Sequence, residues 1–174
     1  SQSFIYFPNL RELDLSYNSM SVITARSFVG LKLLTHLSLI GNTFMSLMPY
    51  SFDGLTCLTT LNLSNTRLKY IREEAFCKMR IMSSLDLASN RIYTLEKDTL
   101  LCLENLKYLN VSNNNIRKVH KLAFFTMESL REVLSDDSEL ICLTHLAIYD
   151  DFLCVGILDS VIKGCITWFC RSEE

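Results

Sequence analysis

Residues 106–116 read Leu-Lys-Tyr-Leu-Asn-Val-Ser-Asn-Asn-Asn-Ile, the clearest copy of a pattern that recurs every 24 residues. Six copies share one register, and each opens on a large apolar side chain: Leu10, Leu34, Leu58, Met82, Leu106 and Leu130. The fourth and sixth positions of the first five copies are also apolar. Because these positions are two residues apart, they lie on one face of a short strand, and the third and fifth positions lie on the other.

A fixed period of this length, with apolar residues at positions one, four and six and Asn at position nine, is the signature of a leucine-rich repeat solenoid. The predicted fold is therefore α/β, with one short strand per repeat in a parallel concave sheet and an irregular convex side. We expect these strands near residues 12–14, 36–38, 60–62, 84–86, 108–110 and 132–134. Stacked strands lie about 4.8 Å apart.

Asn recurs at the ninth position, where the chain turns out of each strand. Its amide offers two donors and an acceptor, so a column of Asn side chains can satisfy the backbone of neighbouring coils. The column consists of Asn18, Asn42, Asn90 and Asn114. Thr66 stands at this position in the third copy, and we expect it to break the ladder.

A second apolar column occupies position 19, on the far side of each coil, and predicts a core spine rather than a ligand site. It contains Phe28, Phe52, Phe76, Leu100 and Phe124. Phe4 and Phe7 fall in register as positions 19 and 22 of an earlier repeat, so the array begins in mid-repeat. Because terminal repeats need a polar cap, we expect further repeats or a cap ahead of Ser1.

The 24-residue pattern ends at residue 135. We therefore divide the chain into leucine-rich repeats over residues 1–134, truncated at the N-terminal side, and a C-terminal cap or hinge-like segment over residues 135–174. Residues 152–170 are apolar enough to suggest a helix that spans a membrane. Asp159 and Lys163 would each cost roughly 3 kcal/mol at the centre of a span, so a capping amphipathic helix is the favoured interpretation and a marginal span the alternative.

The seven cysteines fall into two groups. Four follow the repeats and are candidates for disulfides in a stapled cap, with three pairings open: Cys142, Cys154, Cys165 and Cys170. A zinc site that adds His145 to these cysteines is the alternative in a reducing compartment. Cys57, Cys77 and Cys102 lie within the repeats and are most simply small buried hydrophobic residues, with a Cys77–Cys102 disulfide as the alternative.

Composition and motifs argue against several classes of function. The net charge is −2 and there is no basic stripe, so nucleic acid is not an expected partner. The three histidines, His36, His120 and His145, stand in no metalloprotease or nucleophile-elbow motif. We therefore expect no enzyme activity, no catalytic residue, no resident metal and no cofactor.

Residues 4–134 resemble the 24-residue leucine-rich repeats of extracellular proteins, including Toll-like receptors, small proteoglycans and leucine-rich-repeat G-protein-coupled receptors. Residues 130–142 look more particularly like the hinge that follows the last repeat in those G-protein-coupled receptors, although Ile141 stands where one cysteine of a pair is usual. The resemblance implies a cell-surface glycoprotein that binds a protein or peptide ligand and signals through a membrane domain outside this chain. An extracellular matrix or adhesion protein and an intracellular scaffold are the alternatives.

The predicted ligand surface is the concave sheet, whose central outward positions are mostly small. Larger or charged side chains gather towards its two ends, and Tyr and Arg are the residues most often found at the centre of protein interfaces. The candidate residues are Arg11, Glu12, Asp14 and Tyr17 at one end, Lys107, Tyr108, Arg131, Glu132, Asp136 and Asp137 at the other, and Asp86 between them. Asn62 and Asn110 begin Asn-x-Ser sequons and are candidate glycosylation sites on the same sheet.

Overall fold

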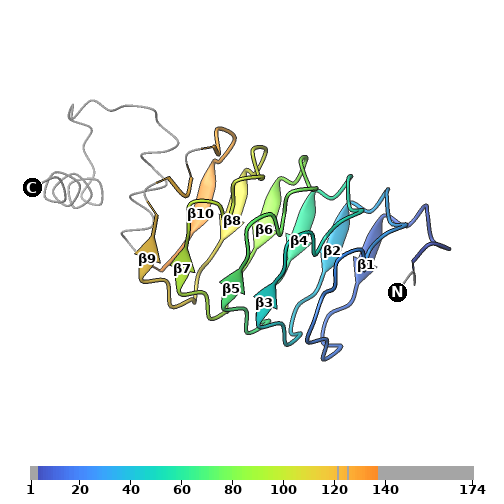
Figure 1. The fold of residues 1–174 in the computed structure, drawn as a ribbon, viewed down its shortest axis with the longest axis horizontal. Helices are drawn as coiled ribbons and strands as arrows, with labels where there is room; N and C mark the ends of the chain where they lie inside the picture. Colours follow the sequence, from blue (N-terminus) through green and yellow to red (C-terminus); the bar gives the residue numbers. More distant parts are fainter. Residues whose placement is uncertain (1–3, 121, 125, 137–174) are drawn as a thin grey trace, which may run out of the picture.

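The computed structural model describes residues 4–120, 122–124 and 126–136. In this part of the chain every regular element is a strand, and the coils stack side by side in sequence order (Figure 1). Six strands form the main sheet: β1 (Glu12–Asp14), β2 (His36–Ser38), β4 (Thr60–Asn62), β6 (Ser84–Asp86), β8 (Tyr108–Asn110) and β10 (Glu132–Leu134). Four shorter strands form two pairs: β3 (Ser46–Leu47) with β5 (Tyr70–Ile71), and β7 (Thr94–Leu95) with β9 (Lys118–Val119).

The main sheet is parallel throughout, in the order β1-β2-β4-β6-β8-β10. Each residue pairs with the one 24 positions further on, as in Leu13 with Leu37 and Leu61 with Leu85. The six predicted strands are confirmed with their bounds, because a repeat of constant length leaves each strand only one partner in register. The family of fold predicted from the period, a leucine-rich repeat solenoid, is likewise confirmed.

The hydrophobic core runs between the main sheet and the far side of each coil. Leu61 and Leu85, at the fourth position, are buried, and so are the apolar residues at positions one and six of the second to fifth coils. Position 19 closes the core from the far side through a single turn, in which the amide of the residue three positions on donates to its carbonyl. Leu10, Leu13 and Leu15 are only partly buried, since the first coil has a neighbour on one side alone.

The predicted asparagine ladder forms at Asn42, Asn90 and Asn114, whereas Asn18 is exposed and its Nδ2 donates to the Ser16 carbonyl of its own coil. Asn42 is buried, and its Nδ2 donates to the carbonyls of Leu39 in its own coil at 2.8 Å and of Leu15 in the preceding coil at 2.9 Å. Its Oδ1 accepts from the amide of Met20 at 2.9 Å. Asn90 and Asn114 repeat this arrangement, so each side chain joins two coils.

Thr66 lies inside this ladder, and the prediction that it breaks the column is wrong. Its side chain is fully buried, and its hydroxyl lies 2.9 Å from both the carbonyl of Leu63 and Oδ1 of Asn90. Its backbone amide also donates to Asn90 Oδ1, at 3.0 Å. The Asn of the next coil thus compensates for the smaller side chain.

The spine on the far side has two parts. Rings stack in series from Phe4 to Phe28, Phe52 and Phe76, with centroids 6.1, 5.9 and 5.9 Å apart. The stack stops where Leu100 occupies the next place. Immediately beside that place Cys77 and Cys102 form a disulfide, with their Cα atoms 4.8 Å apart. These two cysteines are therefore not the buried thiols that their positions predicted, whereas Cys57 is free.

The turn out of each strand places position eight in the left-handed region of backbone space. The residues there are Tyr17, Gly41, Asn65, Ser89 and Asn113, with φ values between 53° and 67°. Gly41 also lies against the neighbouring turn, because a Cβ added to it would stand 2.3 Å from Cδ1 of Tyr17. The absence of a side chain at Gly41 is what allows the Tyr17 ring to lie across the second coil.

Several predictions fall on residues that the structure does not describe. They concern Asp137, the cap cysteines Cys142, Cys154, Cys165 and Cys170, and the choice between a capping helix and a span over residues 152–170. Among the described residues, none forms a helix long and apolar enough to cross a membrane.

Candidate functional site

The outward side chains of the main sheet form two rows, which together we call the sheet face. Position three supplies Glu12, His36, Thr60, Ser84, Tyr108 and Glu132, and position five supplies Asp14, Ser38, Asn62, Asp86, Asn110 and Leu134. Both rows are carried by strands whose alternate residues are fixed in the core, so their side chains are presented on a rigid support. Small polar residues occupy the middle of the face, as the sequence predicts.

Predicted ligand residues gather at the β8–β10 end of the sheet face. Tyr108 and Glu132 are register partners, and Tyr108 is 46% exposed. Lys107 and Arg131 immediately precede β8 and β10, and the Arg131 amide donates a hydrogen bond of 2.9 Å to the Lys107 carbonyl. Asp136 joins this end because its carboxylate accepts from the backbone amide of Asn113. An aromatic ring thus lies among cations and carboxylates, all exposed.

The β1 end carries the other predicted group, Arg11, Glu12, Asp14 and Tyr17. The Ser16 hydroxyl donates to Asp14 at 2.5 Å and the Ser16 amide at 2.8 Å, and these bonds hold the Asp14 pKa below its ordinary value of 3.8. Tyr17 is 72% exposed. Four strand steps of about 4.8 Å separate β1 from β8, so the two end groups lie roughly 19 Å apart.

Asn62 on β4 and Asp86 on β6 lie between the end groups, and Asn110 lies on β8 within the β8–β10 end. The three side chains share one local geometry. Oδ1 of each side chain accepts from the backbone amide two residues on, which belongs to Ala88, Ser64 or Ser112. Asn62 and Asn110 are half-buried, and within the described residues their Nδ2 atoms have no hydrogen-bond partner. The nitrogen that a glycan would modify is therefore free at both positions.

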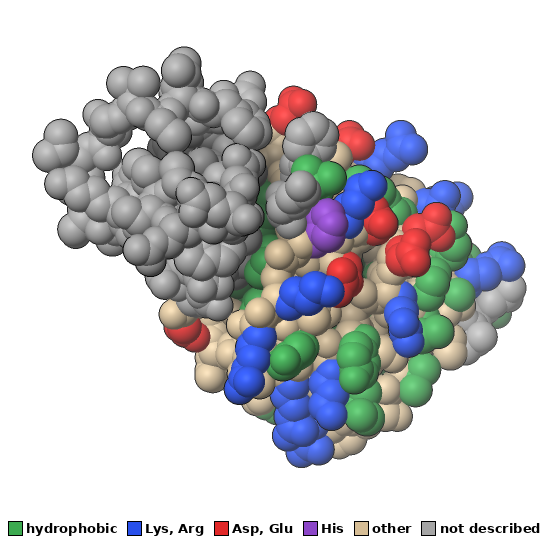
Figure 2. Space-filling view, turned by 60° about the vertical axis from the view of Figure 1, so that its left-hand side comes forward, with side chains coloured by type: hydrophobic (Ala, Val, Ile, Leu, Met, Phe, Trp, Pro, Cys, Tyr) green, Lys and Arg blue, Asp and Glu red, His purple; other side chains and the backbone are tan. Residues whose placement is uncertain are grey.

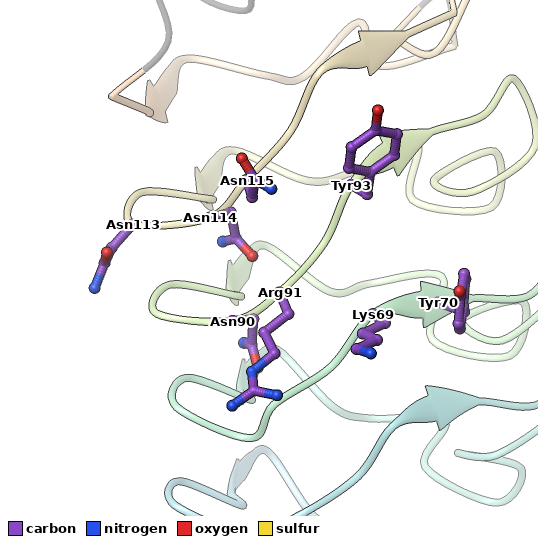
Figure 3. Close-up of a pocket in the computed structure, with 8 residues that line it drawn as sticks. All are labelled: Lys69, Tyr70, Asn90, Arg91, Tyr93, Asn113, Asn114 and Asn115. Atoms are coloured by element: carbon purple, nitrogen blue, oxygen red, sulfur yellow. The ribbon is translucent and has the colours of Figure 1, made fainter.

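The structure also reveals a hollow that our sequence interpretation missed. It has a volume of about 630 Å³ and lies beside the main sheet, where the chain runs from one strand towards the short strands. We call it the flank pocket. Its lining comes from three successive coils: Lys69 and Tyr70, then Asn90, Arg91 and Tyr93, then Asn113, Asn114 and Asn115 (Figure 3). The signal was present in the sequence as polar and aromatic residues at positions eight to thirteen of adjacent repeats.

The described residues contain no cluster of three or more His, Cys, Asp or Glu side chains that could hold a metal ion. Both surfaces instead offer exposed hydrogen-bonding, charged and aromatic groups on a rigid support, which is an arrangement suited to binding.

Comparison with known proteins supports this description. The sequence matches the leucine rich repeat family over residues 1–44, 41–92 and 80–134, a fold that is typically non-catalytic. A chain of the Toll–Spätzle complex from Drosophila is similar over 78% of this chain and 18% of its own length, at 26% identity and a TM-score of 0.73. A chain of the TLR13–ssRNA13 complex is similar over 84% and 21%, at 27% identity and a TM-score of 0.69. A comparison with curated proteins finds no match.

Proposed function

Because this chain belongs to the leucine-rich repeat family, we propose that it is a ligand-binding part of a cell-surface receptor and binds a protein or peptide on its sheet face. The chain spans about a fifth of each of the two similar solved chains, so the activity of the whole receptor belongs to this proposal as well. The observation that carries it is the β8–β10 end, where Tyr108 and Glu132 pair across the sheet beside Lys107 and Arg131.

The chemistry of this end supports a protein partner. Tyr and Arg supply most of the binding energy in many protein interfaces, and unlike charges set the orientation of a partner. The similar solved chains belong to complexes with Spätzle and with ssRNA13. The sheet face carries Glu12, Asp14, Asp86 and Glu132, which would repel phosphates, so a protein or peptide is favoured over nucleic acid.

The disulfide supports a receptor that faces an oxidising compartment. Disulfides persist outside the cell and are rare in the cytosol, so Cys77–Cys102 favours an extracellular receptor or adhesion protein over an intracellular scaffold. The similarity to chains from the Toll and TLR13 complexes favours a receptor of that kind. Assignment to a G-protein-coupled receptor stays a prediction based on residues 130–142.

The proposal is tested by placing a photo-crosslinking amino acid at Tyr108, and in a second protein at Lys97, and exposing both to secreted proteins. The ligand recovered from the Tyr108 protein is then titrated against a Tyr108→Ala, Arg131→Glu double variant. We expect binding at least about tenfold weaker, or about 1.4 kcal/mol, and unchanged binding to Lys97→Glu. Normal binding to the double variant together with a tenfold loss for Lys97→Glu would show that the ligand uses another face.

A further inference from the structure

The flank pocket is lined by cationic, phenolic and amide side chains, and its lining residues include no carboxylate. Lys69 and Arg91 supply two cations from adjacent coils, and the Arg91 amide donates at 2.8 Å to the carbonyl of Leu68, the residue before Lys69. Asn90, Asn113 and Asn114 already donate their Nδ2 hydrogens within the protein, so the donors left for a ligand are chiefly the two cations and the hydroxyls of Tyr70 and Tyr93. Charged donors of this kind favour a ligand that carries anionic groups.

The aromatic residues of the pocket are exposed and can contact a ligand. Tyr70 is 56% and Tyr93 is 48% exposed. The guanidinium of Arg117 stands 6.0 Å from the centre of the Tyr93 ring, within the range of a cation–π contact. A third cation therefore borders the pocket and orients one of its rings. Figure 2 shows Lys and Arg side chains alternating with hydrophobic ones on the face that it brings forward.

The charges around the pocket distinguish between classes of anionic partner. Glu96 directly follows β7 and pairs with Lys118 of β9 at 3.8 Å. Asp136 accepts from the backbone amide of Asn113, a lining residue, so carboxylates lie among the cations around the pocket. The whole chain has a net charge of −2 and a calculated isoelectric point near 5.9. Nucleic-acid-binding domains are usually strongly basic and present an uninterrupted positive stripe. A protein segment with a few acidic residues matches such a mixture of charges better, because unlike charges then fix its register.

We propose that the flank pocket is a second docking site, which binds an acidic segment of a partner protein. Carboxylates of that segment would meet Lys69 and Arg91, and its apolar atoms would cover the rings of Tyr70 and Tyr93. The site is distinct from the sheet face, because its residues follow the strands at positions eight to thirteen while the sheet face uses positions three and five. The two surfaces adjoin where the Asp136 carboxylate accepts from the Asn113 amide.

The experiment measures binding of fluorescently labelled octaglutamate to the full chain by fluorescence anisotropy, with octaglutamine and oligouridylate as comparison probes. The test variant is Lys69→Glu with Arg91→Glu. The matched control is Lys32→Glu with Arg80→Glu, which changes the net charge equally at position 23 of two repeats, ahead of the strands. All four side chains are exposed or half-buried, and thermal unfolding of each variant shows whether the fold is intact.

We expect octaglutamate to bind the wild-type chain more tightly than octaglutamine and to lose at least about tenfold affinity in the test variant alone. A neutral variant, Lys69→Gln with Arg91→Gln, should show an intermediate loss. If the test and control variants lost the same octaglutamate affinity, overall charge would explain the effect and the proposal would be overturned. Tighter binding of oligouridylate, lost on the same reversal, would identify a nucleic-acid site instead, and equal binding of octaglutamine and octaglutamate would also overturn the proposal.

Discussion

The coils before and after Phe76 are joined by different means on the same side of the molecule. From Phe4 to Phe76, the phenylalanine ring of each coil stacks on the ring of the neighbouring coil. The next coil has Leu100 at this position, and the Cys77–Cys102 disulfide links it to the preceding coil. The hydrogen-bond ladders and the main sheet continue unchanged across this boundary. The comparison shows that one architectural role, holding successive coils together on the far side, is met by contact area in one region and by a covalent bond in the other.

The largest expected effect comes from removing a ring in the stacked region. Phe52 is buried and has a ring on each side, so Phe52→Ala should cost about 4 kcal/mol of unfolding free energy. Leu100→Ala removes fewer atoms and should cost about 3 kcal/mol. Equilibrium denaturation in urea measures both. If Leu100→Ala lowered the unfolding free energy more than Phe52→Ala does, the stacked rings would not be what stabilises the first region.

Removing the covalent link should have the next largest effect. The disulfide closes a loop across a sequence separation of 25 residues, and its loss through Cys77→Ser with Cys102→Ser should lower the unfolding free energy by about 3 kcal/mol. Cys57→Ser is the matched control, because that cysteine is free. Substitution is preferred to reductant, which would also act on other cysteines. Equal stability of the double variant and the control would show that this boundary does not need the bond.

A smaller effect should follow from extending the stack into the disulfide region. Leu100→Phe, made in the background that lacks Cys77 and Cys102, places a ring beside Phe76. An aromatic pair contributes about 1 kcal/mol beyond its buried area, so this change should recover about that amount. The same denaturation measurement tests it. A further loss of stability would show that the fifth coil is packed too closely for a ring, and that the two means of joining coils are not interchangeable.

The smallest effect concerns Asp14, at the start of the stacked region. Its pKa is lowered by hydrogen bonds from the hydroxyl and amide of Ser16, so its contribution to stability is fully present above about pH 4, the pKa of an unperturbed Asp. It is lost as the pH falls through the lower folded value. Ser16→Ala should raise the Asp14 pKa towards 3.8, as measured by NMR titration of its carboxyl carbon. An unchanged pKa would assign the shift to the backbone amide alone.

Repetition explains why so much of the fold could be predicted. A constant 24-residue register determines which residues pair and which are buried, so the strands, the core and the Asn column followed from one copy. Thr66 escaped prediction because its environment is set by Asn90 of the following coil. The Cys77–Cys102 disulfide was predicted only as the alternative to buried thiols, because the two cysteines are 25 residues apart, one off the period, and the path of the chain brings their Cα atoms to 4.8 Å.

The candidate surfaces were predicted less completely. The residues of the sheet face could be assigned because strand alternation separates inward from outward side chains. The flank pocket depends on how three irregular segments lie beside one another, and Lys69 stands at repeat position twelve whereas Arg91 and Asn115 both stand at position ten. Strand periodicity carries no information about such segments. A systematic comparison of positions eight to thirteen across all repeats would have shown cations and aromatic residues gathering there.

The disulfide also changes how the chain responds to being cut. Its two cysteines bracket almost one whole coil, so a protease that cleaves anywhere from residue 78 to residue 101 leaves both fragments covalently joined. The β6 strand lies within that bracket and keeps its neighbours β4 and β8 on either side. A single cut between residues 78 and 101 would thus leave one species under non-reducing conditions, whereas a cut in the second coil would leave two pieces held only by packing and hydrogen bonds.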